Sequence, residues 1–354
     1  MRILVAGASG AIGQALVPLL VRAGHDVTGM VQRPRSIEVL HALGAQPRTA
    51  DALDAAAVRE CVREVKPQVV IQQLTAIPPN LDMRHFDREF ALTNLLRTEG
   101  TRNLLAAAVE AGATHFVAQS FAGWTYGRTT NGPVNGKAGN GKAKAINTPR
   151  TAKLKTEDDP LDPDPPKRMR TTLDALKTME HEVLAEKRLT GTVLRYGGFY
   201  GPHTSIAKDG ATVQAIRRRK VPLVGEGAGV WSFVHIDDAA SATAAVVEAG
   251  RGGIFNVVDD EPAPVSEWLS YLAHCAHAQS PRQVPVWLAR MLVGEHVVAM
   301  MNQIRGVSNA KIKRELGWTP RWPTWREGFR EVCKSASLPV RETFGTQSRF
   351  DYRP

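Results

Sequence analysis

The stretch ILVAGASGAIGQALVPLL, residues 3–20, constrains the fold more than any other part of this sequence. An apolar run typical of a β-strand is followed by Gly7, Gly10 and Gly13, and then by an apolar pattern with helical spacing. Glycines at these points permit a tight turn, a close approach of backbone to phosphate, and close packing of a helix on a strand. The stretch therefore predicts a dinucleotide-binding strand, turn and helix, although a plain glycine-rich turn is the alternative.

Short β-branched runs alternate with helical patterns through residues 1–120, which predicts an α/β fold with a doubly wound parallel sheet. The expected strands span 2–6, 26–31, 45–49, 68–73 and 114–119. The expected helices span 11–23, 36–43, 54–65 and about 85–111. A helix at 168–188 and a strand at 192–196 should return to this sheet.

The expected domain organisation has two interleaved parts and a tail. We expect a dinucleotide-binding domain over 1–197, a smaller substrate-binding lobe over 198–334 and a C-terminal tail over 335–354. The first domain contains residues 127–166, which are dense in Gly, Asn, Pro and Lys and predict a long, partly mobile surface loop. In the lobe, one helix is expected over 284–301.

The composition argues against several classes of partner. Seven of the basic residues behind the net charge of +10 fall between 128 and 155, but few aromatic residues accompany them, so we expect a solvated loop and no nucleic acid. Cys61, Cys275 and Cys333 lie far apart and predict no metal site. Since no apolar run approaches about 20 residues and no leader is evident, we expect a cytoplasmic protein without a membrane partner.

The end of the second expected strand indicates which dinucleotide binds. An NAD site usually has an acid there for the ribose 2′-hydroxyl, whereas this chain has Gln32 followed by Arg33 and Arg35. Two guanidinium groups suit a 2′-phosphate. We therefore expect NADP in preference to NAD, unless both arginines are simply solvated.

Several motifs in this order resemble the extended, atypical short-chain dehydrogenase/reductase superfamily, which includes the NAD-dependent epimerases and dehydratases. They are GASGAIG, ADALD, QLTA, EGTRNLLAAA, LRYGGFYGP, VPLVGEGAGVWSFVHIDDAA and SNAKIKRELGWTP. The resemblance implies a Rossmann-type fold and a set of cofactor-binding residues. These are Gly7, Ser9, Gly10, Ala11, Ile12, Gly13, Arg33, Arg35, Asp51, Ala52, Leu74, Thr75, Ala76, Lys177, Tyr196 and Phe199.

The family's chemistry uses a Ser or Thr, a Tyr that exchanges a proton, and a Lys four residues after the Tyr. Lys177 matches the lysine, but Leu173 stands where the tyrosine is expected, and no Tyr occurs between 127 and 195. Ser120 is the candidate to hold a substrate oxygen. Tyr126 is the first candidate for a relocated acid, with a role in the pocket wall as its alternative.

The resemblance also bears on the substrate. Members that act on nucleotide sugars have an arginine where this chain has Trp231, which favours an apolar ligand. Trp124 and Tyr200 are further candidate substrate contacts, although Tyr200 could instead serve packing. We expect an NADP-dependent reductase, dehydrogenase or epimerase-like enzyme that acts on a small, largely apolar carbonyl or alcohol.

Two other functions stay open at this point. The first is a non-catalytic NADP-binding sensor or partner protein, and the second is a non-redox lyase, isomerase or hydrolase that uses the dinucleotide structurally. A homodimer through the helices at 85–111 and 168–188 is expected from the resemblance.

Overall fold

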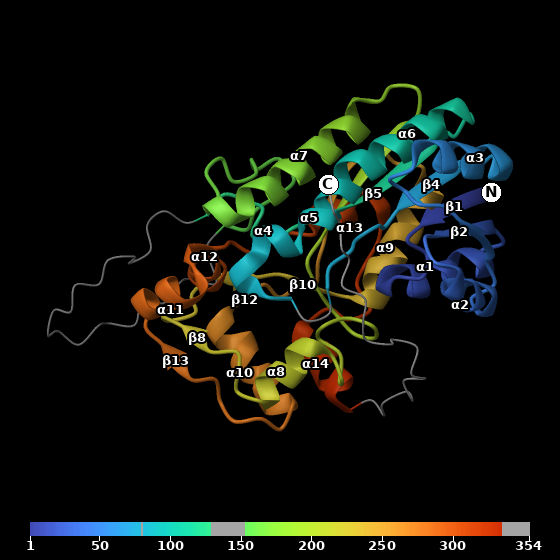
Figure 1. The fold of residues 1–354 in the computed structure, drawn as a ribbon. Helices are drawn as coiled ribbons and strands as arrows, with labels where there is room; N and C mark the ends of the chain where they lie inside the picture. The colour runs from blue at the N-terminus through green and yellow to red at the C-terminus, as the bar shows by residue number, and fades with distance from the viewer. Residues whose placement is uncertain (79–80, 129–152, 335–354) are drawn as a thin grey trace, which may run out of the picture.

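A seven-stranded parallel sheet forms the centre of the computed structural model, which describes residues 1–78, 81–128 and 153–334 (Figure 1). Its strands are β1 (Arg2–Ala6), β2 (Asp26–Val31), β3 (Gln46–Thr49), β4 (Val69–Gln72), β5 (His115–Phe121), β6 (Thr190–Tyr196) and β11 (Gly253–Val257). They lie in the order β11-β6-β5-β4-β1-β2-β3. This order and the parallel pairing confirm the predicted doubly wound, Rossmann-type sheet.

Helices cover both faces of the sheet. On one face lie η1 (Pro34–Ser36), α1 (Ala11–Arg22), α2 (Ile37–Ala42), α9 (Ile236–Ala249) and α13 (Ala310–Leu316), and on the other lie α3 (Ala55–Val65), α6 (Thr101–Glu110) and α7 (Lys167–Ala185). Each face buries its own apolar core, around Leu16 and Val246 on the first and around Leu104 and Met179 on the second. The two cores fix α1 and α7 against opposite faces of the sheet.

The prediction of a single helix over residues 85–111 is wrong in detail. The chain instead forms η2 (Met83–His85), α4 (Phe86–Glu89), α5 (Ala91–Leu95), a π-helical turn η3 (Leu96–Gly100) and then α6. A π turn accommodates an extra residue per turn, so the side chains before and after it do not keep one apolar stripe. The spacing of apolar residues alone could not reveal this break.

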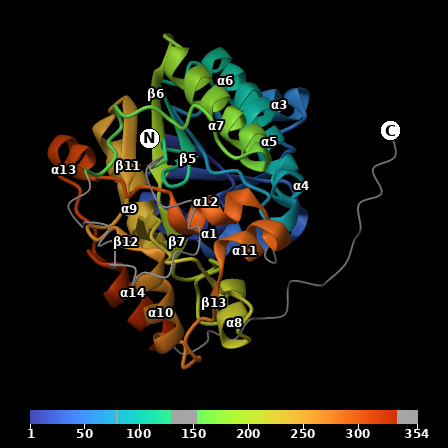
Figure 2. The same cartoon turned by 90° about the vertical axis from the view of Figure 1, so that its left-hand side faces the viewer.

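The smaller lobe consists of short strands and helices after residue 197. They are β7 (Gly198–Tyr200), α8 (Ala211–Arg217), β8 (Leu223–Val224), β9 (Val230–Trp231), β10 (Phe233–His235), β12 (Ala263–Pro264), α10 (Val265–Cys275), β13 (Gln283–Val284), α11 (Val286–Val293), α12 (Glu295–Asn302) and α14 (Trp325–Lys334). Figure 2 shows α8, α10 and α14 gathered at the end of the molecule away from α3 and α6.

The helix predicted at 284–301 is also divided. Gly294 separates α11 from α12 with a φ of +97°, a backbone conformation that favours glycine and breaks the helical hydrogen bonding. Of the predicted loop at 127–166, residues 129–152 lie outside the described part of the chain, as does the predicted tail at 335–354. Residues 153–166 are packed on the protein, since Lys155 pairs with Val307 in a β-bridge.

Candidate active site

The glycine turn between β1 and α1 has the shape that a diphosphate requires. Gly7 has a φ of +87°, and a Cβ there would lie 2.7 Å from the carbonyl oxygen of Gln73. A Cβ on Gly13 would lie 2.3 Å from the carbonyl oxygen of Ala8, so only glycine allows this helix to pack so closely. Gly10 caps α1 without a side-chain hydrogen bond, which leaves backbone N–H groups of the first turn free to bind phosphate.

The residues that follow Gly7 in this turn differ in their exposure. Ser9 and Ala11 are half-buried, while Ile12 is buried and anchors α1 on the sheet. These positions are consistent with cofactor contacts through the backbone of residues 9–12. Their individual contacts stay predictions.

The adenosine side of the predicted cofactor site lies at the carboxyl ends of β2 and β3. Asp51 Oδ2 accepts a hydrogen bond of 3.0 Å from Gln32 Nε2, and its Oδ1 accepts one of 3.0 Å from the Leu53 amide. Arg33 is exposed beside them, and Arg35 lies in η1. The end of β2 therefore carries an amide and a guanidinium, and no acid.

The segment after β4 leads from the glycine turn toward the centre of the sheet. Leu74 and Ala76 are half-buried and Thr75 is exposed, so this segment has surface left for a ligand. The Ala76 amide donates a 3.0 Å hydrogen bond to Thr93 Oγ1, which fixes the segment on α5. Ala52 is buried, and its carbonyl accepts from Asn103.

Leu173 and Lys177 lie one turn apart on α7. Leu173 has no exposed surface, whereas Lys177 is half-buried and its Nζ donates a 3.2 Å hydrogen bond to the carbonyl oxygen of Asp162. Leu173 has no proton to donate. A ribose hydroxyl could replace the single backbone acceptor of Lys177.

A buried polar network joins the two other predicted catalytic residues. Ser120 Oγ donates to Glu180 Oε1 at 2.6 Å, and Arg195 donates to both oxygens of Glu180 at 2.8 and 2.5 Å. Arg195 also donates to the Tyr126 hydroxyl at 2.9 Å, and that hydroxyl donates to Asn256 Oδ1 at 2.7 Å. Burial raises the pKa of Tyr126, and the nearby Arg195 opposes this shift.

The network bears on the predicted roles of Ser120 and Tyr126. A proton donor has to come within hydrogen-bonding reach of its substrate. Tyr126 has no exposed surface and Ser120 is 2% exposed, and both hydroxyls already have partners. The geometry thus brings the two residues together in one buried network, and the burial of Tyr126 corrects our placement of its side chain in the pocket wall. A catalytic role for either residue stays a prediction.

Two of the predicted substrate contacts share one apolar cluster. Trp124 and Trp231 are half-buried and pack against a buried group made of Phe86, Phe90, Met169 and Met300. The Trp124 ring meets Phe86 edge to face at 5.7 Å, and Trp231 Nε1 donates to the Met300 carbonyl at 2.9 Å. The cluster joins α4, α7, β9 and α12, so it connects the sheet domain with the smaller lobe.

The side chains of Tyr200 and Tyr196 are buried outside the apolar cluster that contains Trp124 and Trp231. Tyr200 is fully buried in the core of the smaller lobe, with its ring 5.3 Å from that of Phe329, so the packing alternative describes its position. The Tyr196 hydroxyl is fully buried and bonded to Thr243, and burial raises its pKa to about 12. A cofactor contact of Tyr196 would therefore involve its backbone. Phe199 is half-buried beside it.

Besides Arg195, a second buried cation was not anticipated from the sequence. Arg97 lies in η3 and is 7% exposed, although it belongs to a segment where the buried positions are otherwise apolar or neutral. The sequence showed only that Arg97 was a charged residue within an expected amphipathic helix. Because the π turn interrupts that helix, helical spacing could not show that Arg97 faces the interior.

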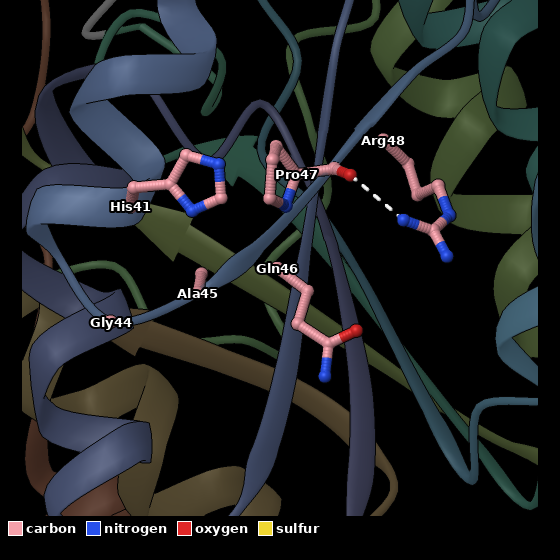
Figure 3. Close-up of a pocket in the computed structure, with 6 residues that line it drawn as sticks. All are labelled: His41, Gly44, Ala45, Gln46, Pro47 and Arg48. Atoms are coloured by element: carbon pink, nitrogen blue, oxygen red, sulfur yellow. Dashed lines mark hydrogen bonds between the residues drawn. The ribbon is translucent and has the colours of Figure 1, made fainter.

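The hollow drawn in Figure 3 lies away from this site. It is formed by the connection between α2 and β3, and its lining runs from His41 to Arg48 at the edge strand. Among the described residues, no group of His, Cys, Asp and Glu is arranged to hold a metal ion. No helix in the described ranges has both the length and the apolar character needed to cross a membrane.

Comparison with known proteins now defines the class. The model of the NAD dependent epimerase/dehydratase family matches residues 3–257, and the chain belongs to this family. A 3-diazoavenalumate denitrifying reductase from Streptomyces sp is 39% identical over 340 residues, which cover 93% of this chain and 99% of that protein. The family and this relative support an NAD(P)-dependent oxidoreductase or epimerase with a small-molecule substrate.

Solved structures confirm the fold. The UDP-glucose 4-epimerase of Thermotoga maritima has a TM-score of 0.71 at 20% identity, with 94% of this chain and 97% of that chain covered. A human epimerase family protein solved with NADPH has a TM-score of 0.68 at 18% identity, with 95% and 100% covered. A UDP-glucose 4-epimerase of Thermus thermophilus solved with NAD has a TM-score of 0.69 at 24% identity, with 94% and 98% covered. The family description itself names NAD, and a nicotinamide dinucleotide is therefore the cofactor that the family supports.

Proposed function

We propose that this protein is an NADPH-dependent reductase that replaces the diazonium group of an aromatic acid with hydrogen and releases N₂. The observation that carries the proposal is the buried, apolar Leu173 at the expected position of the proton donor, in a chain that keeps an intact glycine turn. The relative named as a diazo-compound reductase supports the substrate class.

The proton balance of the reaction explains why a tyrosine is dispensable. A bound nicotinamide supplies a hydride. Reduction of a carbonyl to an alcohol adds one hydride and one proton, so it needs an acid. In an arenediazonium ion, the C–N bond breaks with its electron pair leaving on N₂, and the hydride pair forms the C–H bond. The charges +1 and −1 cancel, and no proton donor is required.

The chemistry of the diazonium group also favours an unreactive neighbour. Arenediazonium ions couple covalently to phenolate rings, so a tyrosine with a lowered pKa beside the reacting carbon would be modified by its own substrate. Leu173 cannot couple. Tyr126 is enclosed in the network with Arg195, and burial holds its pKa above the usual range, so it too is protected.

The chain's own residues have separable tasks in this proposal. The turn at Gly7 and the start of α1 hold the diphosphate, Lys177 exchanges its bond to Asp162 for the ribose, and Arg33 and Arg35 receive the 2′-phosphate. The half-buried Trp124 and Trp231 offer aromatic faces to a planar cationic arene. An arginine in place of Trp231 would repel that cation.

Reduction of a small, largely apolar carbonyl, or oxidation of the alcohol, is the second candidate. It is favoured by Lys177, which could relay a proton through water, and by Ser120 at the end of β5. This chemistry would require Ser120 to leave Glu180. A sensor role would instead show as tight NADPH binding without turnover of any substrate.

The test is anaerobic incubation of the protein with NADPH and an arenediazonium carboxylate labelled with ¹⁵N. We expect one labelled N₂ and one aromatic carboxylate, with hydrogen in place of the diazonium group, per NADPH oxidised, at a rate proportional to the protein concentration. Oxidation of NADPH by aldehydes or ketones only would favour the second candidate and overturn the proposal.

A further inference from the structure

The π turn η3 directs Arg97 into the protein interior. Such turns insert an extra residue into a helix and occur frequently at functional sites. Arg97 is 7% exposed, and its Nη1 has no hydrogen-bond partner among the described residues. Burial alone lowers its pKa, to about 10, and no described carboxylate offsets the effect. Since an unpaired buried cation is costly, the arrangement calls for an anion.

Two buried amides, one in α5 before η3 and one bonded to the residue that follows η3, are also incompletely satisfied. Asn94 precedes Arg97 by three residues, and its Nδ2 donates to Thr172 Oγ1 at 3.1 Å. Gln72, at the end of β4, donates from Nε2 to Thr101 Oγ1 at 3.2 Å, and Thr101 follows Arg97 by four residues. The amide oxygens of Asn94 and Gln72 have no partner among the described residues.

The hydroxyl partners allow both amides to act as donors toward a ligand. A threonine hydroxyl can donate as well as accept, and the oxygen and nitrogen of an amide can exchange places by rotation. With Thr172 and Thr101 donating, the NH₂ groups of Asn94 and Gln72 become free. Together with Arg97 they form a set of three buried donors, which suits an acceptor that carries negative charge.

We propose that Arg97, Asn94 and Gln72 bind the carboxylate of the aromatic substrate. The identity of that substrate rests on the function proposed above. A ribose diol is neutral and would leave the Arg97 charge unpaired. The diphosphate of the dinucleotide is expected at the start of α1, which follows β1, and β1 is separated from β5 by β4 in the sheet.

The position of the aromatic cluster supports this orientation of the substrate. Phe90 precedes Asn94 by one helical turn, and Met169 precedes Thr172 by three residues on α7. Figure 1 shows α4, α5 and α7 side by side, and the contacts between them agree. An aromatic ring at Trp124 and an acid group at Arg97 would therefore be arranged along the same pair of helices.

The test measures binding and needs no turnover. Cinnamate and its neutral amide, cinnamamide, are titrated by calorimetry into the protein loaded with NADP⁺. We expect the wild-type protein to prefer cinnamate by about 30-fold, since hydrogen bonds to charged groups are worth that much. Arg97→Met should abolish this preference without changing the affinity for NADP⁺. Arg88→Met, on the exposed surface of α4, removes the same charge and should change neither.

The thermal stability of the variants separates binding from structure. Arg97→Met should keep or raise Tm, because it removes an unpaired buried charge. A fall in Tm with an unchanged cinnamate preference would overturn the proposal, as would a loss of NADP⁺ affinity. Arg97→Lys keeps the charge and should retain part of the preference, and it decides the matter if the Met variant does not fold. Absence of N₂ release with intact Arg97-dependent binding would count against the proposed reaction alone.

Discussion

Arg195 and Glu180 form a two-point ion pair, with donor–acceptor distances of 2.8 and 2.5 Å, in which both side chains are buried. The pair joins β6 to α7 and so fixes the helix that carries Leu173 and Lys177. Removing one partner of a buried ion pair is destabilising, because the other charge then stays buried without compensation.

Glu180→Gln should therefore destabilise the protein strongly. We expect the free energy of unfolding to fall by about 3 kcal/mol, because the buried Arg195 charge loses its partner. Urea denaturation measures the change. Glu99→Gln breaks an exposed pair with Arg102 and should cost less than about 1 kcal/mol. Equal losses for the two variants would show that the burial of the Glu180 pair has no energetic consequence.

Tyr126→Phe separates a structural role from a catalytic one. The change leaves Asn256 and Arg195 each without one hydrogen bond, so we expect a loss of about 1–2 kcal/mol in stability. The kcat for an arenediazonium substrate should stay within about twofold of the wild-type value, measured below the unfolding temperature. A large fall in kcat with native stability would restore Tyr126 as the acid.

Gly7→Ala should strongly weaken cofactor binding. The new Cβ would lie 2.7 Å from the Gln73 carbonyl oxygen in a turn with φ +87°. We expect the Kd for NADPH, measured by fluorescence titration, to rise on the order of 100-fold. Gly24→Ala is the matched control, because its φ is +82° but nothing lies within 4 Å of the new Cβ. If both variants bound NADPH normally, the diphosphate would bind elsewhere.

Arg33→Ala tests the choice of dinucleotide. Loss of a guanidinium that contacts the 2′-phosphate should weaken NADPH binding by about 10- to 100-fold. The affinity for NADH, which lacks that phosphate, should not change. Equal effects on the two cofactors, or none, would count against the NADP assignment.

His115 should make stability depend on pH. Burial lowers its pKa from 6.5 to about 4, and Nε2 is bonded to Thr192 at 2.8 Å. The unfolded chain therefore binds a proton more readily than the folded protein, so stability falls as pH decreases from about 6.5 to 4. The contribution is about 3 kcal/mol by pH 4. His115→Gln should reduce this slope in urea denaturation, and an unchanged slope would contradict the assignment.

The parts of the site that depend on local backbone conformation could be predicted from the sequence. Gly7 and Gly13 are required by a turn and a close contact that involve residues nearby in the chain or in adjacent strands. Burial of Tyr126 depends instead on Arg195 and on Asn256, which is 130 residues away. No local pattern indicates such a network.

Arg97 shows a second reason why prediction fails. Helical spacing assigns a residue to a face only while the turn keeps its regular width. The π turn at 96–100 shifts that assignment and brings a charged side chain inward. Its direction follows from the packing of η3 against α7, which the sequence pattern does not encode.

NADPH deuterated at the transferable C4 position, incubated with an arenediazonium carboxylate, tests whether the cofactor hydride replaces the nitrogen. Direct hydride transfer from the cofactor should place the deuterium on the ring carbon that lost nitrogen, with one N₂ per NADP⁺ formed. The Gly7→Ala variant corrects for the uncatalysed reaction. Solvent hydrogen at that carbon, or N₂ release at the same rate with the Gly7→Ala variant, would contradict this transfer.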